Sequence, residues 1–232
     1  MIPLLYTTHN RLEFTQKTLP QLFKNTIGDV LFVILDTGST DGTVEYLKNS
    51  IDKLACEKNY RLFTLGDMRV SEAMDFFFDY MSVSQYLFEY AAKVDNDTLV
   101  PLNWLSDMLS VVKDNNIDIL QAKHHIMNNN VKDWDEWVTQ LQQKEYKDNT
   151  IFFNDFVGGS GSVFKKKVMI PFSANSSSQR RLHGWTELQA QHPEWIKAFY
   201  DGVFIQLLDM KDDNVLDHTL YPEYYSFTQR KI

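Results

Sequence analysis

The sequence has a single cysteine, Cys56, among its 232 residues. One thiol excludes an internal disulfide and any metal site built from several cysteines. A chain without disulfides is typical of a reducing compartment. We therefore expect Cys56 to be an ordinary thiol near a helix end.

Long apolar runs are also missing, because no stretch approaches the ~18 residues that a membrane-spanning helix needs. The first residues, Met1 to Arg11, lack the basic region and long apolar core of a secretory signal. The sequence thus predicts neither secretion nor an integral membrane segment. We expect a cytoplasmic location and leave peripheral attachment to a membrane open.

Positive charge is scarce: 23 Lys and Arg face 31 Asp and Glu, which gives a net charge of −8. Such a chain has no general attraction for nucleic acid phosphates, so a nucleic acid is not the expected partner, although a local basic patch would still permit one. Hydrophobic residues make up 44% of the chain, enough for a sizeable core. We expect one domain over residues 1–232.

In the first half, apolar runs of strand length alternate with helical patterns. The expected strands are Ile2–Tyr6, Val30–Leu35, Tyr60–Leu65, Leu87–Val94 and Ile117–Ala122. Four helices fall between them, the first of which Pro20 is expected to kink or divide. This alternation predicts an α/β fold with an open, mostly parallel sheet, helices on both of its faces, and ligands bound beyond the carboxyl ends of the strands.

The second half, residues 126–232, is less regular. The polar stretch Ile126–Thr150 indicates loop and helix outside the main sheet, and a helical segment is expected from His183 to about Tyr200, interrupted at Pro193. Val203–Leu208 is a candidate for the last strand, and Ser173–Arg181 indicates a surface loop that could act as a lid.

Two short motifs in this half leave alternatives open. Gly158 and Gly159 either let the backbone approach a ligand closely or serve a tight turn. The run Lys165–Lys167 is expected to be a solvated turn rather than a phosphate clamp.

The triplet Asp95-Asn96-Asp97 follows the fourth apolar run directly. Alternate residues of a strand share a face, so two carboxylates at its end could address one point beyond the sheet. Such carboxylates repel each other unless a cation lies between them, and Mg²⁺ or Mn²⁺ prefers these oxygen donors and shares its coordination with phosphates. An acidic chain also makes such triplets by chance, as Asp133-Trp134-Asp135 shows; only the first triplet has a strand-like approach.

Three motifs in register resemble the family 2 glycosyltransferases of GT-A fold. They are Thr7-Thr8-His9-Asn10-Arg11 after the first strand, Asp36-Thr37-Gly38-Ser39-Thr40-Asp41-Gly42-Thr43 after the second, and Asp95-Asn96-Asp97. The resemblance covers about the first 125 residues and weakens through the Gly158-Gly159 segment. It implies a Rossmann-like, GT-A type domain with a nucleotide-sugar half (1–125) and a less regular acceptor half with a C-terminal tail (126–232).

The resemblance implies roles for individual residues of the donor site. Thr8 and Arg11 would lie at the nucleotide, and Asp36 would receive the base or the ribose. Asp97 would hold Mn²⁺ or Mg²⁺, and Asp95 would bind the ribose or share that metal. The Gly158-Gly159 segment is similar to the loop that contacts the donor sugar and the acceptor.

The resemblance also implies a catalytic base and a further metal ligand. Glu187 resembles the carboxylate that deprotonates the acceptor in inverting members, although Leu188 stands where many members have a second acidic residue. Asp155 is the other candidate base, because it lies close to the glycines. His218 is similar to a histidine that completes the metal shell in some GT-A enzymes. A second departure is Thr37, which replaces the second of two aspartates common before the Gly-Ser turn.

The implied activity is metal-dependent transfer of a sugar from a UDP- or GDP-type donor to an unknown acceptor, with inversion. Two alternatives remain at this stage. One is a catalytically inactive module that binds nucleotide sugars. The other is a sugar-nucleotide nucleotidyltransferase, for which the glycine-rich basic loop after the first strand is missing.

Overall fold

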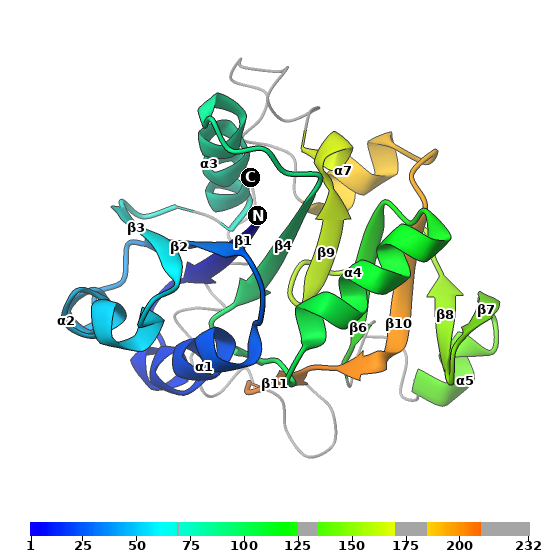
Figure 1. The fold of residues 1–232 in the computed structure, drawn as a ribbon, viewed down its shortest axis with the longest axis horizontal. Helices are drawn as coiled ribbons and strands as arrows, with labels where there is room; N and C mark the ends of the chain where they lie inside the picture. The colour runs from blue at the N-terminus through cyan, green and yellow to red at the C-terminus, as the bar shows by residue number, and fades with distance from the viewer. Residues whose placement is uncertain (69, 125–133, 170–184, 210–232) are drawn as a thin grey trace.

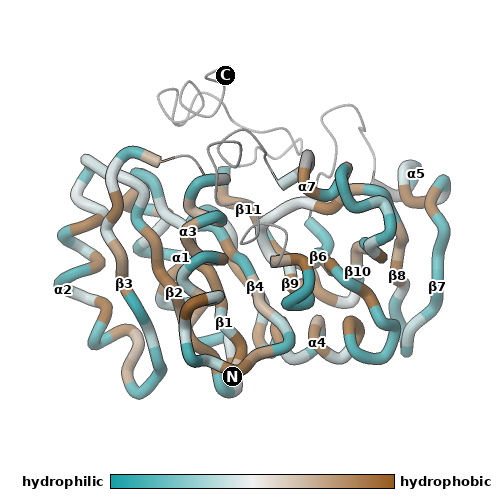
Figure 2. Tube along the Cα trace, turned by 90° about the horizontal axis from the view of Figure 1, so that it is seen from above, coloured by the Kyte–Doolittle hydropathy of each residue, from teal (hydrophilic) through white to brown (hydrophobic). Residues whose placement is uncertain are grey.

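A computed structural model describes residues 1–68, 70–124, 134–169 and 185–209 of the chain. Its main feature is a nine-stranded sheet with the order β3-β2-β1-β4-β9-β6-β10-β8-β7. Figure 2 shows these strands side by side across the molecule, from β3 at one edge to β7 at the other. Because β7 to β10 come from the second half of the chain, both halves contribute to one sheet.

Four parallel strands form the first half of the sheet. They are β1 (Ile2–Thr8), β2 (Val30–Thr37), β3 (Asn59–Leu65) and β4 (Tyr90–Asp95). All eight residues of β2 are buried, as expected for a parallel strand covered on both faces. The α/β fold with parallel core strands, predicted from the alternating pattern, is confirmed.

The second half of the sheet is mixed. Its strands are β6 (Ile119–Lys123), β7 (Gln142–Tyr146), β8 (Asn149–Phe153), β9 (Ser162–Lys165) and β10 (Lys197–Phe204). β6 and β10 are parallel neighbours, whereas β9 is antiparallel to both β4 and β6, and β8 is antiparallel to β10 and to β7. The strand β9 thus joins the two halves of the sheet.

Helices cover both faces of the sheet (Figure 1). On one face α1 (Leu12–Asn25), α2 (Thr43–Ala55) and α4 (Trp104–Asn115) share a core cluster with the even-numbered residues of β1, such as Leu4 and Tyr6. On the other face α3 (Val70–Val83), α5 (Trp134–Val138) and α7 (Trp185–Gln191) contribute to a second cluster that includes Leu5. Alternate residues of β1 therefore serve separate cores.

Two expectations for the elements need correction, and a third is narrowed. Pro20 lies inside α1 without dividing it, so a kink stays the prediction there. The stretch before Thr150 is not wholly outside the sheet, because β7 forms its exposed edge. The helix expected to reach Tyr200 ends at Gln191, since Pro193 cannot continue it and the next residues gain more burial between β6 and β8.

The expected last strand, Val203–Leu208, is divided between two sheets. Its first residues finish β10, and β11 (Gln206–Leu207) pairs instead with β5 (Thr98–Leu99) in a two-stranded sheet. The expected loop Ser173–Arg181 lies outside the described residues. The lysine run ends β9 and forms the 3₁₀ turn η1 (Lys166–Val168), and both Lys165 and Lys167 contact Asp118 at 3.1 and 2.8 Å.

No helix in the described part of the chain has the length and apolar character needed to span a membrane.

Candidate functional site

The polar ends of three neighbouring strands lie side by side at the carboxyl edge of the sheet. Thr8 at the end of β1 is level with Asp36 of β2, and Thr7 is level with Asp95 of β4. The parallel pairing of these strands thus brings the three sequence motifs to one edge. This edge is where ligands bind in open α/β sheets.

Asp36 is fully buried and organises the loop that follows it. One of its oxygens accepts hydrogen bonds from the backbone N–H groups of Gly38 and Ser39, at 3.1 and 3.0 Å, and the other accepts from the hydroxyls of Ser39 and Thr8. A carboxylate held by several donors is strongly fixed in place. Asp36 therefore sets the shape of the Gly38–Thr40 loop.

The first and second motifs are also tied directly to each other. The Asn10 side-chain oxygen accepts from the N–H of Thr40 at 2.8 Å, and the Ser39 hydroxyl accepts from the N–H of Asn10 at 2.7 Å. Asp41 caps two helices at once, because it accepts from Leu12 N–H at 2.8 Å and from Thr43 N–H at 3.1 Å. The two loops thus form one rigid unit beside the strand ends.

The third motif begins with Asp95, whose carboxylate lies against Lys93 two residues earlier on the same face of β4. The Lys93 ammonium is 2.5 and 2.6 Å from the two carboxylate oxygens, and the hydroxyl of Thr7 also donates to Asp95. Lys93 is only 3% exposed, whereas the Asp95 side chain is 25% exposed. Asp95 therefore presents one side to solvent above a buried cation.

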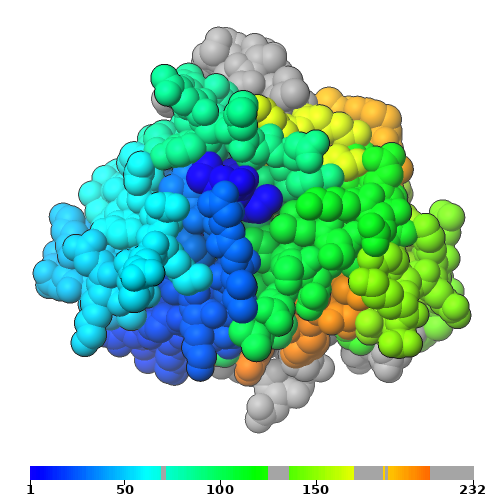
Figure 3. Space-filling view, in the orientation of Figure 1, coloured from blue at the N-terminus to red at the C-terminus, as the bar shows by residue number. Residues whose placement is uncertain are grey.

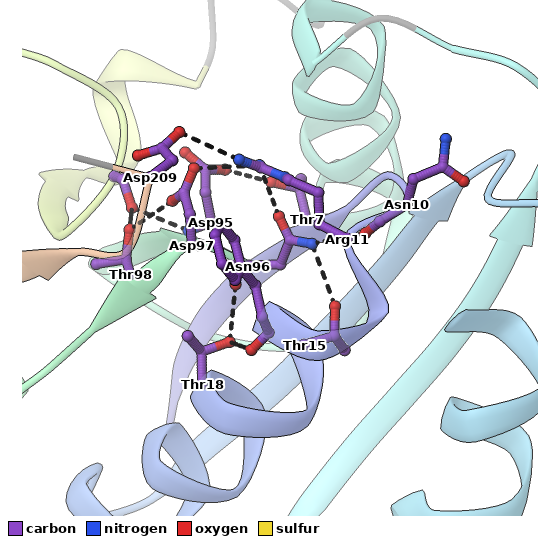
Figure 4. A network of polar contacts seen from close by, with 12 residues as sticks. Thr7, Asn10, Arg11, Thr15, Thr18, Asp95, Asn96, Asp97, Thr98 and Asp209 are labelled. Carbon is purple, nitrogen blue, oxygen red and sulfur yellow. Dashed lines mark hydrogen bonds and ion pairs between the residues drawn. The ribbon is translucent and has the colours of Figure 1, made fainter. Parts of the chain in front are cut away.

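Arg11 connects the triplet to a distant part of the chain (Figure 4). Its guanidinium lies 3.1 Å from Asp97, 3.2 Å from Asp209 and 2.9 Å from the side-chain oxygen of Asn96. The Thr98 hydroxyl donates to the other oxygen of Asp97 at 2.9 Å. Arg11 also lines a pocket of about 300 Å³ at the start of α1, together with Leu12, Glu13, Gln16 and Asp41.

The backbone after β10 returns to the triplet. β11 pairs with β5, which follows the triplet directly, and the N–H of Leu208 donates to the carbonyl oxygen of Asp97 at 2.8 Å. In Figure 3 the orange atoms of this segment reach the lower edge of the face beside green atoms. This return places Asp209 in the site although it is 112 positions from Asp97 in the sequence.

The glycines of the expected sugar loop pack against buried polar side chains. A Cβ at Gly158 would lie 2.6 Å from the Gln121 amide nitrogen, and one at Gly159 would lie 3.2 Å from the Lys93 ammonium. Next to them, the Ser160 hydroxyl accepts from the N–H of Asp95 at 2.9 Å. The backbone at both glycines thus packs closely against the ends of two buried side chains, and the same segment lies directly against the triplet.

The two candidate bases stand in segments that pack on the α3 side of the sheet through Val157 and Leu188. Asp155 is exposed, two residues before Val157. The helix α7, which contains Glu187, is docked on Val157 by hydrogen bonds of Gln189 and Trp185 to its backbone at 2.8 to 3.0 Å. The backbone thus brings both candidates near the glycines, while the side chain of Glu187 and the whole of His218 lie outside the described residues.

A divalent cation would have to be held mainly by Asp97 and Asp95. Within the described ranges, no group of three or more His, Cys, Asp or Glu could form a metal cage. The network nevertheless has three carboxylates facing two cations, so it carries a net charge of −1 when all five groups are ionised. These residues fit a cation that takes one or two carboxylates from the protein and the rest of its ligands from phosphate and water.

Sequence reasoning did not find Lys93, Ser160 or Asp209. Lys93 had a signal, because a lysine inside an apolar strand must be paired if it is buried. Asp209 had none, since its partner Arg11 is far away in the sequence and no local pattern predicts the return of the chain.

Comparison with known proteins gives one family match. The model of the family described as "Glycosyl transferase family 2" matches residues 5–170. A comparison with curated proteins found no significant match.

Several solved structures have a similar fold. A mannosyltransferase from Pyrobaculum calidifontis, in complex with GDP-Man and Mn²⁺, has a TM-score of 0.67 at 12% identity over 92% of this chain and 58% of its own. S. aureus TarS (1–349) in complex with UDP has a TM-score of 0.58 at 13% identity, over 89% of this chain and 61% of its own. GalNAc-T7 with UDP, GalNAc and Mn²⁺ has a TM-score of 0.64 at 12% identity, over 89% of this chain and 43% of its own. This chain thus spans less than two thirds of each, and the similarity establishes a GT-A fold.

Proposed function

The chain belongs to the glycosyl transferase family 2, and from this premise we propose that it transfers a sugar from a nucleoside-diphosphate sugar to an acceptor with the help of a divalent cation. One observation carries the proposal most directly. The ends of β1, β2 and β4 meet at one edge of the sheet, and Asp95 and Asp97 both keep exposed surface there, 25% and 14% of their side chains.

The donor diphosphate is proposed to bind beside Asp97 and Asp95, which would hold Mn²⁺ or Mg²⁺ with it. When bound, the cation would neutralise the charge that develops on the departing nucleoside diphosphate. The similar structures that contain GDP-Man with Mn²⁺, and UDP with Mn²⁺, support this assignment. His218 stays a prediction for a further metal ligand.

The nucleoside is proposed to lie against the interlocked loops after β1 and β2. Because Asp36 is fully buried and bonded to Gly38 and Ser39, direct contact with a base or ribose would require those bonds to rearrange. Within the proposal, Asp36 and Thr8 therefore act by fixing the loop that receives the nucleoside. The segment around Gly158 and Gly159 would then face the donor sugar.

The acceptor is proposed to approach on the α3 side, where α7 and Asp155 lie near the glycines. Either Glu187 or Asp155 would remove the proton from the acceptor, and such a base opposite the leaving group gives inversion. The family match favours this transfer over nucleotidyl transfer.

Thermal shift assays with UDP, GDP and their sugars, each with and without Mn²⁺, test the proposal. Ligand at 100 times its Kd should stabilise the folded protein by about 2.7 kcal/mol. We expect a shift for one of the two bases that is larger with Mn²⁺, with ADP as the control nucleotide. No shift with any UDP- or GDP-type ligand would contradict the proposal. A shift without Mn²⁺-dependent release of nucleotide from its sugar would instead indicate an inactive binding module.

A further inference from the structure

Arg11 is a buried cation shared by three segments of the chain. Its side chain is 2% exposed and contacts Asp97 and Asn96 of the triplet, and Asp209 after β11. Its backbone is fixed as well, since it has a φ of 59° and its carbonyl oxygen accepts from the N–H groups of Phe14 and Thr15 at the start of α1. Arg11 is therefore held in place from both ends.

This position is next to the carboxylate that the proposed function assigns to the metal. The guanidinium nitrogen is 3.1 Å from Asp97, so a cation bound to the same carboxylate would lie within a few ångströms of a positive charge. Like charges at such distances repel, and burial strengthens the repulsion because water screens it less. Metal binding at Asp97 therefore opposes the Arg11 contact.

Arg11 does not depend on Asp97 alone. Asp209 at 3.2 Å and Asn96 at 2.9 Å hold other parts of the same guanidinium. If Asp97 turned to a metal ion, these contacts would keep the arginine beside the site. Two added negative phosphates would then offset the repulsion between the arginine and the metal.

We propose that Arg11 is a positioning residue that makes this site bind a divalent cation and a nucleoside diphosphate together rather than the cation alone. The inference rests on the proposed function. Without ligands, Arg11 supplies the counter-charge that holds Asp97 and Asp209 together. With both ligands, its charge is shared between Asp209 and the diphosphate, so each ligand raises the affinity for the other.

Titration of Mn²⁺, followed by the electron paramagnetic resonance signal of the free ion, tests this coupling without any catalytic readout. In the wild type, Mn²⁺ alone should bind weakly, and saturating UDP or GDP should tighten it by about 5- to 150-fold, the usual range of such coupling. In Arg11→Gln, Mn²⁺ alone should bind at least about 5-fold tighter than in the wild type, and the gain from nucleotide should shrink.

Lys165→Gln is the matched control. It also removes a cation from an ion pair, but its partner is Asp118, away from the triplet. Its Mn²⁺ affinity should equal that of the wild type. If Arg11→Gln does not fold, Arg11→Lys is the second variant. It keeps the positive charge but loses the guanidinium fork that spans Asp97 and Asp209. Its Mn²⁺ affinity should therefore rise, but less than that of Arg11→Gln.

The outcomes separate this inference from the proposed function. Unchanged Mn²⁺ affinity in whichever Arg11 variant folds, in a protein whose wild type binds Mn²⁺ with UDP or GDP, would overturn the role of Arg11 alone. A wild type that binds Mn²⁺ with neither nucleotide would contradict the proposed function itself.

Discussion

Buried charged side chains at the ends of β2 and β4 are each held by more than one contact. Lys93 lies against both oxygens of Asp95, and Asp36 receives donors from Gly38, Ser39 and Thr8. Burying a charge without such partners costs several kcal/mol. At the scale of single residues, the site is therefore fixed before any ligand binds.

Gly38 offers a direct test of the loop that Asp36 organises. It has a φ of +94°, and an added Cβ would lie 2.8 Å from the backbone nitrogen of Asp67. We expect Gly38→Ala to lower the free energy of unfolding by about 1–3 kcal/mol, because both the backbone and the close contact would be strained. Urea denaturation measures the change.

Gly66→Ala is the control for that substitution, since a Cβ there would meet nothing within 4 Å. Its effect should stay within about 0.5 kcal/mol. Equal stability of the two variants would show that the loop is not held in the described conformation.

The residues of the site could be predicted only where the signal is local. The triplet after β4 and the Gly-Ser turn after β2 stand at the ends of recognisable apolar runs, so their place at the sheet edge followed from the alternating pattern. The contact of Arg11 with Asp209 depends on the pairing of β11 with β5, which no spacing of residues in the sequence predicts. The buried state of Asp36 was also not predictable, because a strand end says nothing about which way its last side chain turns.

At the scale of elements, Asp118 joins the starts of β6 and β10 to the end of β9. Its carboxylate contacts Lys165 at the end of β9 and Lys167 at 3.1 and 2.8 Å, and it accepts from the N–H of Ile196 before β10 at 2.9 Å. Burial alone would raise the pKa of Asp118, but hydrogen bonds from Lys167, Ile196 and Lys165 outweigh burial and lower the pKa. The charged carboxylate therefore stabilises the junction of β6, β9 and β10.

Asp118→Asn should lower the free energy of unfolding by about 1.5–3 kcal/mol at pH 7, the usual range for hydrogen bonds to a charged group. Because the pKa is lower in the folded state, the wild type has its full advantage above the ordinary aspartate pKa of about 3.9 and loses it as the pH falls further. Denaturation of both proteins between pH 7 and pH 2 measures this. A difference that does not shrink in acid would argue against a charged Asp118.

The first-half elements were predictable and several later ones were not. β1, β2 and β4 are apolar runs of strand length separated by helical patterns, and burial on both faces of a parallel sheet produces that signal. The first part of β10, up to Tyr200, was expected to be helical, and only its place between β6 and β8 makes it a strand. The strand β7 is polar since it forms an exposed edge, so it carried no apolar pattern.

For the whole molecule, the second half of the chain completes a site that the first half begins. The sheet continues from β4 through β9 into β6 and β10, and the backbone then returns through β11 to place Asp209 at Arg11. The family match covers residues 5–170, whereas this return lies beyond them. The three polar motifs were therefore visible in the sequence, and their connection to the segment after β11 was visible only in the fold.

Calorimetric titration of UDP and GDP in the presence of Mn²⁺ into the wild type and Asp97→Asn tests the central claim, a diphosphate site whose metal is held at Asp97. The control is Asp107→Asn, which neutralises an exposed carboxylate on α4. The account predicts Mn²⁺-dependent binding of one nucleotide to the wild type and to the control, and a loss of the Mn²⁺ dependence in Asp97→Asn. Equal Mn²⁺-dependent binding by all three proteins would contradict it.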